Sequence, residues 1–191
     1  MTDWLRHELE VSGRPGEVAA FRMVAAGANI VPWELDLASG EEDWFLLIVR
    51  AAPRGLGIGG ARALAAQLRA AVDARHSALC AWIGRNHACP LDLHALVPVP
   101  SAILRRGPDD PASRAWLWGN WGTTEALRHV REIPARPGRR RGLARFRVEF
   151  YAADWTPWRA LLAMRVRWPS LRFEVWPDYD SDCAPSGSPG G

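Results

Sequence analysis

Tryptophan is concentrated in two short stretches of the chain. Three of its 11 tryptophans lie within residues 116–121, and two more lie within residues 153–158. Each indole offers a large apolar face and one N–H donor, so such a group either belongs to a core or lines a groove that accepts a base or a peptide. Large aromatics at this spacing are usually buried, and we favour a structural corner in which glycines let backbones approach closely. The groove alternative would use Trp116, Trp118, Trp121, Thr123, Trp155 and Trp158.

Arginine is concentrated just before an expected strand. The chain has 24 basic residues, all of them arginine, against 21 acidic ones. Guanidinium groups bind phosphate oxygens well, so these arginines, at one edge of the expected sheet, predict contact with nucleic acid. The alternative interpretation is that they belong to a solvated loop without a partner. On the expected open face of the sheet, alternating Arg and Glu indicate ion pairing between strands rather than the stacked rings of an RNA-binding sheet. The edge comprises Arg136, Arg139, Arg140, Arg141, Arg145 and Arg147.

Two further patterns resemble cofactor sites. Cys80, His87, Cys89 and His94 are possible zinc ligands, but their spacing matches no common zinc motif. Residues 55–60 read GLGIGG, which satisfies the dinucleotide-binding glycine pattern without the parallel strand that should directly precede it. We therefore predict neither a metal nor a cofactor.

Catalytic groups are sparse. Glu125 and His129 are four residues apart and could pair on a helix, but no serine or cysteine lies near them in the sequence. Asp154 is the only fair candidate for an acidic group at the end of a strand, where a nuclease would need one. The sequence therefore favours a protein that is not an enzyme.

Composition suggests where the protein works. The net charge of +3 permits an anionic partner without requiring one, and three cysteines are an odd number for a disulfide framework. The first ten residues are charged and lack the apolar core of a signal peptide. No uncharged apolar run approaches the roughly 20 residues of a membrane span. We expect a reduced, cytoplasmic protein without membrane contact.

Hydrophobic periodicity predicts the order of the elements. Apolar residues alternate in the expected strands, and recur at helical spacing in the helices, of which the longest carries an apolar stripe from Ala61 to Trp82. For residues 40–51 a capping box at Ser39 and Glu42 favours helix over a buried strand. The predicted strands are residues 5–13, 91–100, 143–153 and 171–178, and the predicted helices are residues 15–26, 40–51, 58–83, 109–120, 123–133 and 156–168.

This order predicts an α+β fold, in which a ferredoxin-like antiparallel sheet carries helices on one face and a helical insertion. We expect one domain over residues 1–180, with its core in residues 5–27 and 91–180 and the insertion in residues 31–90. Residues 181–191 lack a core-forming pattern and are predicted to be a disordered tail. If residues 40–51 formed a strand instead, the first 85 residues would make a complete βαββαβ unit, and the chain would hold two such domains.

Several fragments resemble one known family. These are LEVSG at residues 9–13, LVPVP at 96–100, NWGTTEAL at 120–127, ADWTPW at 153–158 and WPSLRFEVWPDYD at 168–180. In this order they resemble the YubB-like ferredoxin-like domain family of uncharacterised plasmid and phage proteins. The chain departs from the family pattern at Thr124 and Glu125, where Lys and Trp are usual, and at Trp158, where a second proline is usual. The resemblance implies the fold and a mobile-element origin, and implies no activity.

Together these observations predict a non-enzymatic binding or adaptor module with an unknown protein or nucleic acid as its partner. The alternative is an accessory protein that binds or processes nucleic acid through the arginine-rich edge. A metal-dependent enzyme is a third, weaker interpretation.

Overall fold

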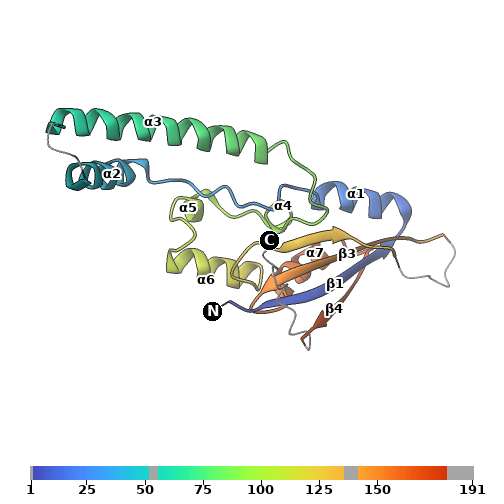
Figure 1. Ribbon diagram of the computed structural model, residues 1–191. Coiled ribbons are helices and arrows are strands. Elements are labelled where there is room, and N and C mark those ends of the chain that lie inside the picture. The colour runs from blue at the N-terminus through green and yellow to red at the C-terminus, as the bar shows by residue number, and fades with distance from the viewer. Residues whose placement is uncertain (1, 52–55, 136–141, 180–191) are drawn as a thin grey trace, which may run out of the picture.

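A four-stranded antiparallel sheet, in spatial order β2-β3-β1-β4, organises the protein (Figure 1). The computed structural model describes residues 2–51, 56–135 and 142–179, so the predicted tail at 181–191 lies outside the described residues. The first strand is central and pairs with β3 on one side and β4 on the other, which joins both ends of the chain in one sheet. This is the strand order of a ferredoxin-like fold, as predicted. The strands are β1 (Trp4–Gly13), β2 (Arg128–Glu132), β3 (Ala144–Ala153) and β4 (Arg172–Asp178).

Two helices cover one face of the sheet. Helix α1 (Pro15–Ala25) places Phe21 against Phe146 of β3 and Phe173 of β4, with ring centroids 6.2 and 5.4 Å apart. Helix α7 (Trp158–Arg167) buries Leu161 and Met164 beside them. The period-two pattern of each strand decides which residues face these helices, because successive side chains point to opposite faces.

The other face of the sheet carries the predicted ion pairs. Arg6 and Arg131 bind the two carboxylate oxygens of Glu149 at 2.5 and 2.7 Å, and Arg145 binds Glu10 at 2.8 Å. Burial opposes the charge on Glu149, but hydrogen bonds from the two arginines outweigh it and lower the pKa of this carboxyl below its usual value. The carboxylates are nearly buried because the long arginine side chains lie across them.

The insertion forms a helical hairpin that extends away from the sheet (Figure 1). Helices α2 (Leu37–Ala51) and α3 (Ile58–Ile83) pack side by side. The helix predicted over residues 40–51 is thus confirmed, and the tandem alternative is excluded. Helix α2 begins earlier than expected, because Asp36 acts as its cap: the Asp36 carboxylate accepts from the amide of Ser39 at 3.0 Å. The predicted capping box would have made Ser39 the cap.

The long helix α3 is confirmed, but its predicted apolar stripe is mostly not buried. Only Ala61 and Ala65 of this helix are buried, whereas Leu64, Leu68 and Trp82 remain 41–47 % exposed. A sequence pattern identifies an apolar face without identifying what covers it. In the part of the chain that the structure describes, no helix is long and apolar enough to cross a membrane.

Residues 91–100 do not form the predicted strand. They begin with one turn of helix, α4 (Leu93–Leu96), and after an extended stretch lead into a second single turn, α5 (Ser101–Leu104). The Asp92 carboxylate starts α4 by accepting from the amide of His94 at 2.8 Å. This cap starts a helical turn where the sequence pattern predicted a strand, because a polar residue next to apolar ones can be either a helix cap or an exposed strand position.

Residues 123–133 do not form the predicted helix either. Helix α6 (Pro111–Asn120) is confirmed and begins at an Asp110 cap, but the chain after it enters β2, which pairs with the edge of β3. A bulge between Arg128 and Arg131 holds His129 at φ 49°, a conformation that interrupts helical and strand periods alike. Helix α7 is shorter than the predicted range of 156–168, since it begins after Pro157 and ends at Arg167.

Candidate ligand cleft at the tryptophan corner

Trp121 anchors the corner that the tryptophan-rich stretch builds. Its side chain is fully buried, and its indole N–H donates to the carbonyl of Val97 at 2.9 Å. Its own carbonyl accepts from the amide of Ala160 in the first turn of α7 at 3.2 Å. Trp116 packs edge to face against it at 6.2 Å. Trp121 thus joins α6 both to the segment that follows α4 and to the start of α7, and its fully buried indole offers no face to a ligand.

The residues after Trp121 attach the corner to the end of β3. Gly122 has φ 82°, and a Cβ there would lie 3.0 Å from the amide nitrogen of Trp158. The buried hydroxyl of Thr123 donates to the carbonyl of Ala153 at 2.9 Å, and that of Thr124 donates to Asp154 at 2.7 Å. Only glycine combines this backbone conformation with so close an approach, and the two hydroxyls supply the polar contacts of the turn.

Beside this corner lies a cleft of about 690 Å³ that opens to solvent. Its walls come from the chain between α1 and α2, from α6, and from the loop that leads into β2. Its apolar lining includes Trp33, Leu117 and Leu127. Its charged lining consists of Asp109, Arg114, Glu125, Arg128 and Asp154.

The two guanidinium groups of the cleft are already engaged. Arg114 binds Asp109 at 3.1 Å, and Arg128 binds Glu125 at 3.1 Å while lying 3.8 Å from the ring centroid of Trp4. The third carboxylate, that of Asp154, binds neither guanidinium and accepts from the hydroxyl of Thr124 and the amide of Asp3. Because a carboxylate has about four acceptor positions, most of the acceptor capacity of the lining remains for a ligand or water.

Two lining residues have left-handed backbone conformations, which are uncommon outside glycine. Asn29 has φ 55° and Asp154 has φ 62°. Asn29 is held by its amide, which donates to Asp92 at 2.8 Å, and by its side-chain Nδ2, which donates to the carbonyl of Leu127 at 2.6 Å. Its buried Oδ1 has no hydrogen-bond partner. Strained residues and orphaned acceptors are more frequent at binding sites than elsewhere.

The other predicted tryptophans do not meet in one groove. Trp155 stacks on Tyr179 with ring centroids 5.6 Å apart, and Trp158 lies under the guanidinium of Arg159 at 3.9 Å. Trp118 is 46 % exposed on α6. The structure thus brings Trp116 and Trp121 together in the corner and leaves the remaining three as separate surface rings.

The predicted arginine edge falls largely outside the described residues. Arg136, Arg139, Arg140 and Arg141 are in the part of the chain that the structure does not describe. Arg147 binds Glu8, and Arg145 binds Glu10 at 2.8 Å. These two guanidiniums already neutralise carboxylates of the sheet, so phosphate would have to compete for them.

The sequence analysis did not identify a series of hydrogen bonds that runs through His7, Thr156 and Tyr179. His7 Nδ1 lies 2.8 Å from the carbonyl of Leu5 and therefore donates, so Nε2 accepts from the Thr156 hydroxyl at 2.9 Å. Thr156 lies 2.7 Å from the hydroxyl of Tyr179, which then donates to it. Burial lowers the pKa of His7 below its usual value, so the ring is neutral. The only sequence signal was a polar residue at an inward position of an alternating strand.

The possible zinc ligands are used individually. Cys89 Sγ donates to the carbonyl of Leu91 at 3.3 Å, and His94 Nδ1 accepts from the amide of Val99 at 3.2 Å. His87 Nδ1 faces the carbonyl of Ala26, and Cys80 faces His76 on the same helix. Within residues 2–51, 56–135 and 142–179, no three His, Cys, Asp or Glu side chains are grouped so that they could hold a metal.

The possible pair of Glu125 and His129 on one helix does not form, because His129 lies in β2 against Tyr151.

Comparison with known proteins provides information about the fold and not about the function. No family model matches the chain, and no curated protein matches it. Among solved structures, a protein api92 from Yersinia pseudotuberculosis, described under the family model DUF1281, is similar with a TM-score of 0.52 at 13 % identity. The similarity covers 93 % of this chain and 90 % of that one. The insertion and the sheet thus have a counterpart of similar extent in a bacterial protein.

Proposed function

We propose that this protein is a non-enzymatic binding or adaptor module whose cleft receives a basic side chain of a protein partner. The observation that carries the proposal is the imbalance of charge in the lining, which has three carboxylates against two guanidiniums that are already paired. Hydrogen-bond acceptors in excess attract a donor-rich cation, and a guanidinium brings five N–H donors.

The shape of the cleft supports a side chain rather than a free small molecule. Pockets that hold small molecules commonly enclose 70–90 % of the ligand surface. This cleft is open, and Asp109 on its rim is almost fully exposed. The indole of Trp33 supplies an apolar wall against which the aliphatic part of an arginine or lysine can pack. The mobile-element origin implied by the sequence resemblance is part of the same proposal and is compatible with an adaptor.

The test uses two matched probes, N-acetyl-arginine amide and N-acetyl-citrulline amide, which differ in the charge and donor count of the head group. In two-dimensional NMR we expect the arginine probe to shift the amides of residues 29–33 and 124–128 saturably, with affinity in the millimolar range of about −4 kcal/mol. The citrulline probe should cause smaller shifts. Glu125→Gln should weaken the arginine effect, whereas Glu174→Gln, on β4 and absent from the lining, should not.

Shifts that are absent, equal for both probes, or unchanged in Glu125→Gln would refute the proposal.

The nucleic-acid alternative has its own test, motivated by the run of arginines at 136–141. A mobility shift with single- or double-stranded oligonucleotides that is sensitive to salt, and is lost when Arg139, Arg140 and Arg141 are changed to Ala, would favour that alternative.

A further inference from the structure

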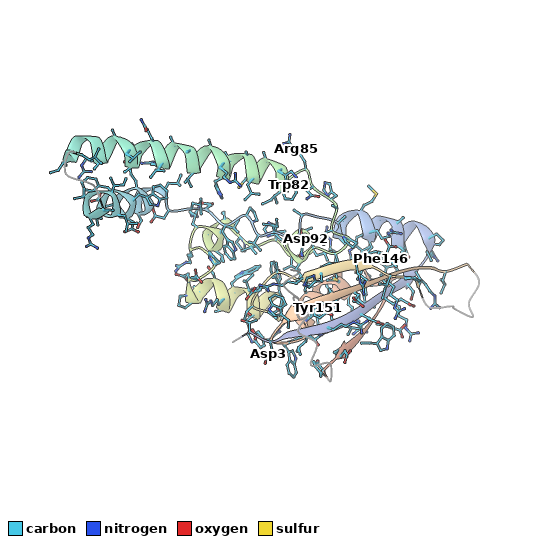
Figure 2. All side chains as sticks on the ribbon, viewed as in Figure 1. Asp3, Trp82, Arg85, Asp92, Phe146 and Tyr151 are labelled. Atoms are coloured by element: carbon cyan, nitrogen blue, oxygen red, sulfur yellow. The ribbon has the colours of Figure 1, made fainter. Side chains whose placement is uncertain are left out.

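The hairpin of α2 and α3 leaves the body of the protein with little support. Among the described helices and strands, α3 has only α2 as a neighbour. The hairpin joins the domain through two connecting segments, which contact each other at the bridge between Gly27 and Cys89 and through the hydrogen bond from the Asn29 amide to Asp92. Figure 2 shows Trp82 and Arg85 at the end of α3 that lies above the domain, while the other end projects freely.

Apolar side chains on this hairpin remain uncovered. Helix α2 buries no residue completely, although residues 44–49 read WFLLIV and are apolar all round. A helix that is apolar on every side is normally enclosed by other elements. Here Leu46, Leu47 and Val49 are 43–61 % exposed. The hairpin therefore presents a surface that one further layer of helices would cover.

On α3 the exposed apolar residues lie along one side of the helix, interrupted once by Arg75. Steps of three and four residues place them next to the side that contacts α2. Four of them, Leu64, Leu68, Leu79 and Trp82, are 41–47 % exposed. We call this surface the α3 stripe; it consists of Leu64, Leu68, Ala71, Arg75, Leu79 and Trp82.

The spacing of the α3 stripe is nearly the same read in either direction. Leu64 and Trp82 lie nine residues before and after position 73, and Leu68 and Leu79 lie five before and six after it. If a second α3 packs antiparallel with the twofold axis at this level, Leu64 faces Trp82 of the second copy and Leu68 faces its Leu79. A twofold interface requires such reciprocal matching of one patch with itself.

We propose that the α3 stripe is the interface of a homodimer, in which the hairpins of two chains form an antiparallel four-helix bundle. The small side chain of Ala71 faces the Arg75 stem of the second copy, which lets the helix axes approach to about 8–10 Å. The four large stripe residues expose roughly 400 Å² per chain, which is about half of the roughly 800 Å² per partner of a stable complex. The exposed Leu46, Leu47 and Val49 of α2 add further apolar surface on the same hairpin.

The self-matching register gives a specific test in the full-length chain. Light scattering after gel filtration should give twice the chain mass of 21.2 kDa for the wild type at about 100 µM. Leu68→Glu and Leu79→Arg should each be monomeric, with the dissociation constant of the dimer raised at least about 100-fold, because each puts two unpaired charges into the interface. An equimolar mixture of the two variants should dimerise again. In the mixed pair, the new carboxylate at 68 faces the new guanidinium at 79, and the remaining Leu79 and Leu68 face each other.

Val166→Glu is the matched control, because Val166 is 82 % exposed on α7 and should leave the dimer intact. Circular dichroism and thermal unfolding establish that each variant is folded. A wild-type chain that is monomeric, a dimer that persists in both charged variants, or a mixture that stays monomeric would each overturn the proposal. Binding of a different protein by a monomeric hairpin would count against it in the same way.

Discussion

Gly122 offers a sharp test of how the tryptophan corner is built. Its φ of 82° is in the left-handed region, and a Cβ there would approach the amide nitrogens of Trp158 and Arg159 to 3.0 and 3.2 Å. These atoms belong to the backbone at the start of α7, which the hydrogen bond from Ala160 to Trp121 holds in place. The contact cannot be relieved by rotation of a side chain.

The cost of Gly122→Ala follows from two contributions. Holding an alanine in the left-handed conformation costs about 1–2 kcal/mol. Overpacking against a fixed backbone adds about 1–3 kcal/mol. We therefore expect the free energy of unfolding to fall by roughly 2–5 kcal/mol, which at a urea m-value of about 2 kcal/mol/M moves the midpoint by about 1–2.5 M.

The measurement is urea unfolding followed by tryptophan fluorescence, with Gly119→Ala as the matched control. Gly119 lies in α6 three residues earlier, and a Cβ there meets nothing within 4 Å. Its replacement should be neutral or stabilising by up to about 1 kcal/mol, because alanine favours a helix over glycine. If Gly122→Ala unfolds within about 0.5 kcal/mol of the wild type, or if both changes cost the same, the account of the corner is wrong.

Three further predictions concern buried polar groups. Thr123→Val should lower the free energy of unfolding by about 1 kcal/mol in the same urea assay, because it removes the hydrogen bond to Ala153; an unchanged midpoint would contradict this. Glu149→Gln should cost about 1–2 kcal/mol in chemical unfolding by weakening two ion pairs, whereas the exposed Glu174→Gln should cost less than about 0.5 kcal/mol, and equal losses would count against the sheet-face network. The lowered pKa of buried His7 means that the unfolded chain binds a proton which the folded ring does not, so stability from this site is present above about pH 6.5 and declines as the pH falls below it. His7→Gln should flatten that part of the curve of stability against pH measured between about pH 7 and 5, and an unaltered slope would refute the assignment.

Much of the core could be read from the sequence because its signals are local. Alternation in the first and third strands identified Leu9, Val11, Phe146, Val148 and Phe150, all of which are buried. Helices α1, α6 and α7 were found from proline, capping residues and apolar spacing. In each of these segments, propensity, period and burial agree, so no distant contact was needed to choose the structure.

Segments with ambiguous local signals were decided by distant contacts. The residues that become β2 have helical spacing, but the free edge of β3 offers hydrogen bonds that a separate helix would not satisfy. The chain after Leu91 forms a helical turn instead of the predicted strand, because Asp92 accepts from the amides of both His94 and Asn29. The contact with Asn29 could not be chosen from the sequence, since Asn29 lies more than sixty residues away.

The candidate cleft shows the same division. The sequence alone favoured a corner at the tryptophan-rich stretch, in which Gly119 and Gly122 let backbones approach closely, and the structure shows such an approach at Gly122 but none at Gly119. The sequence also indicated that arginine and glutamate would pair across the sheet. Only the tertiary structure placed Asn29, Glu125 and Asp154 around one cleft and left the apolar side of α3 uncovered. The physical reason is that period and composition depend on neighbours along the chain, whereas a cleft and an exposed face depend on which distant segments pack together and which do not.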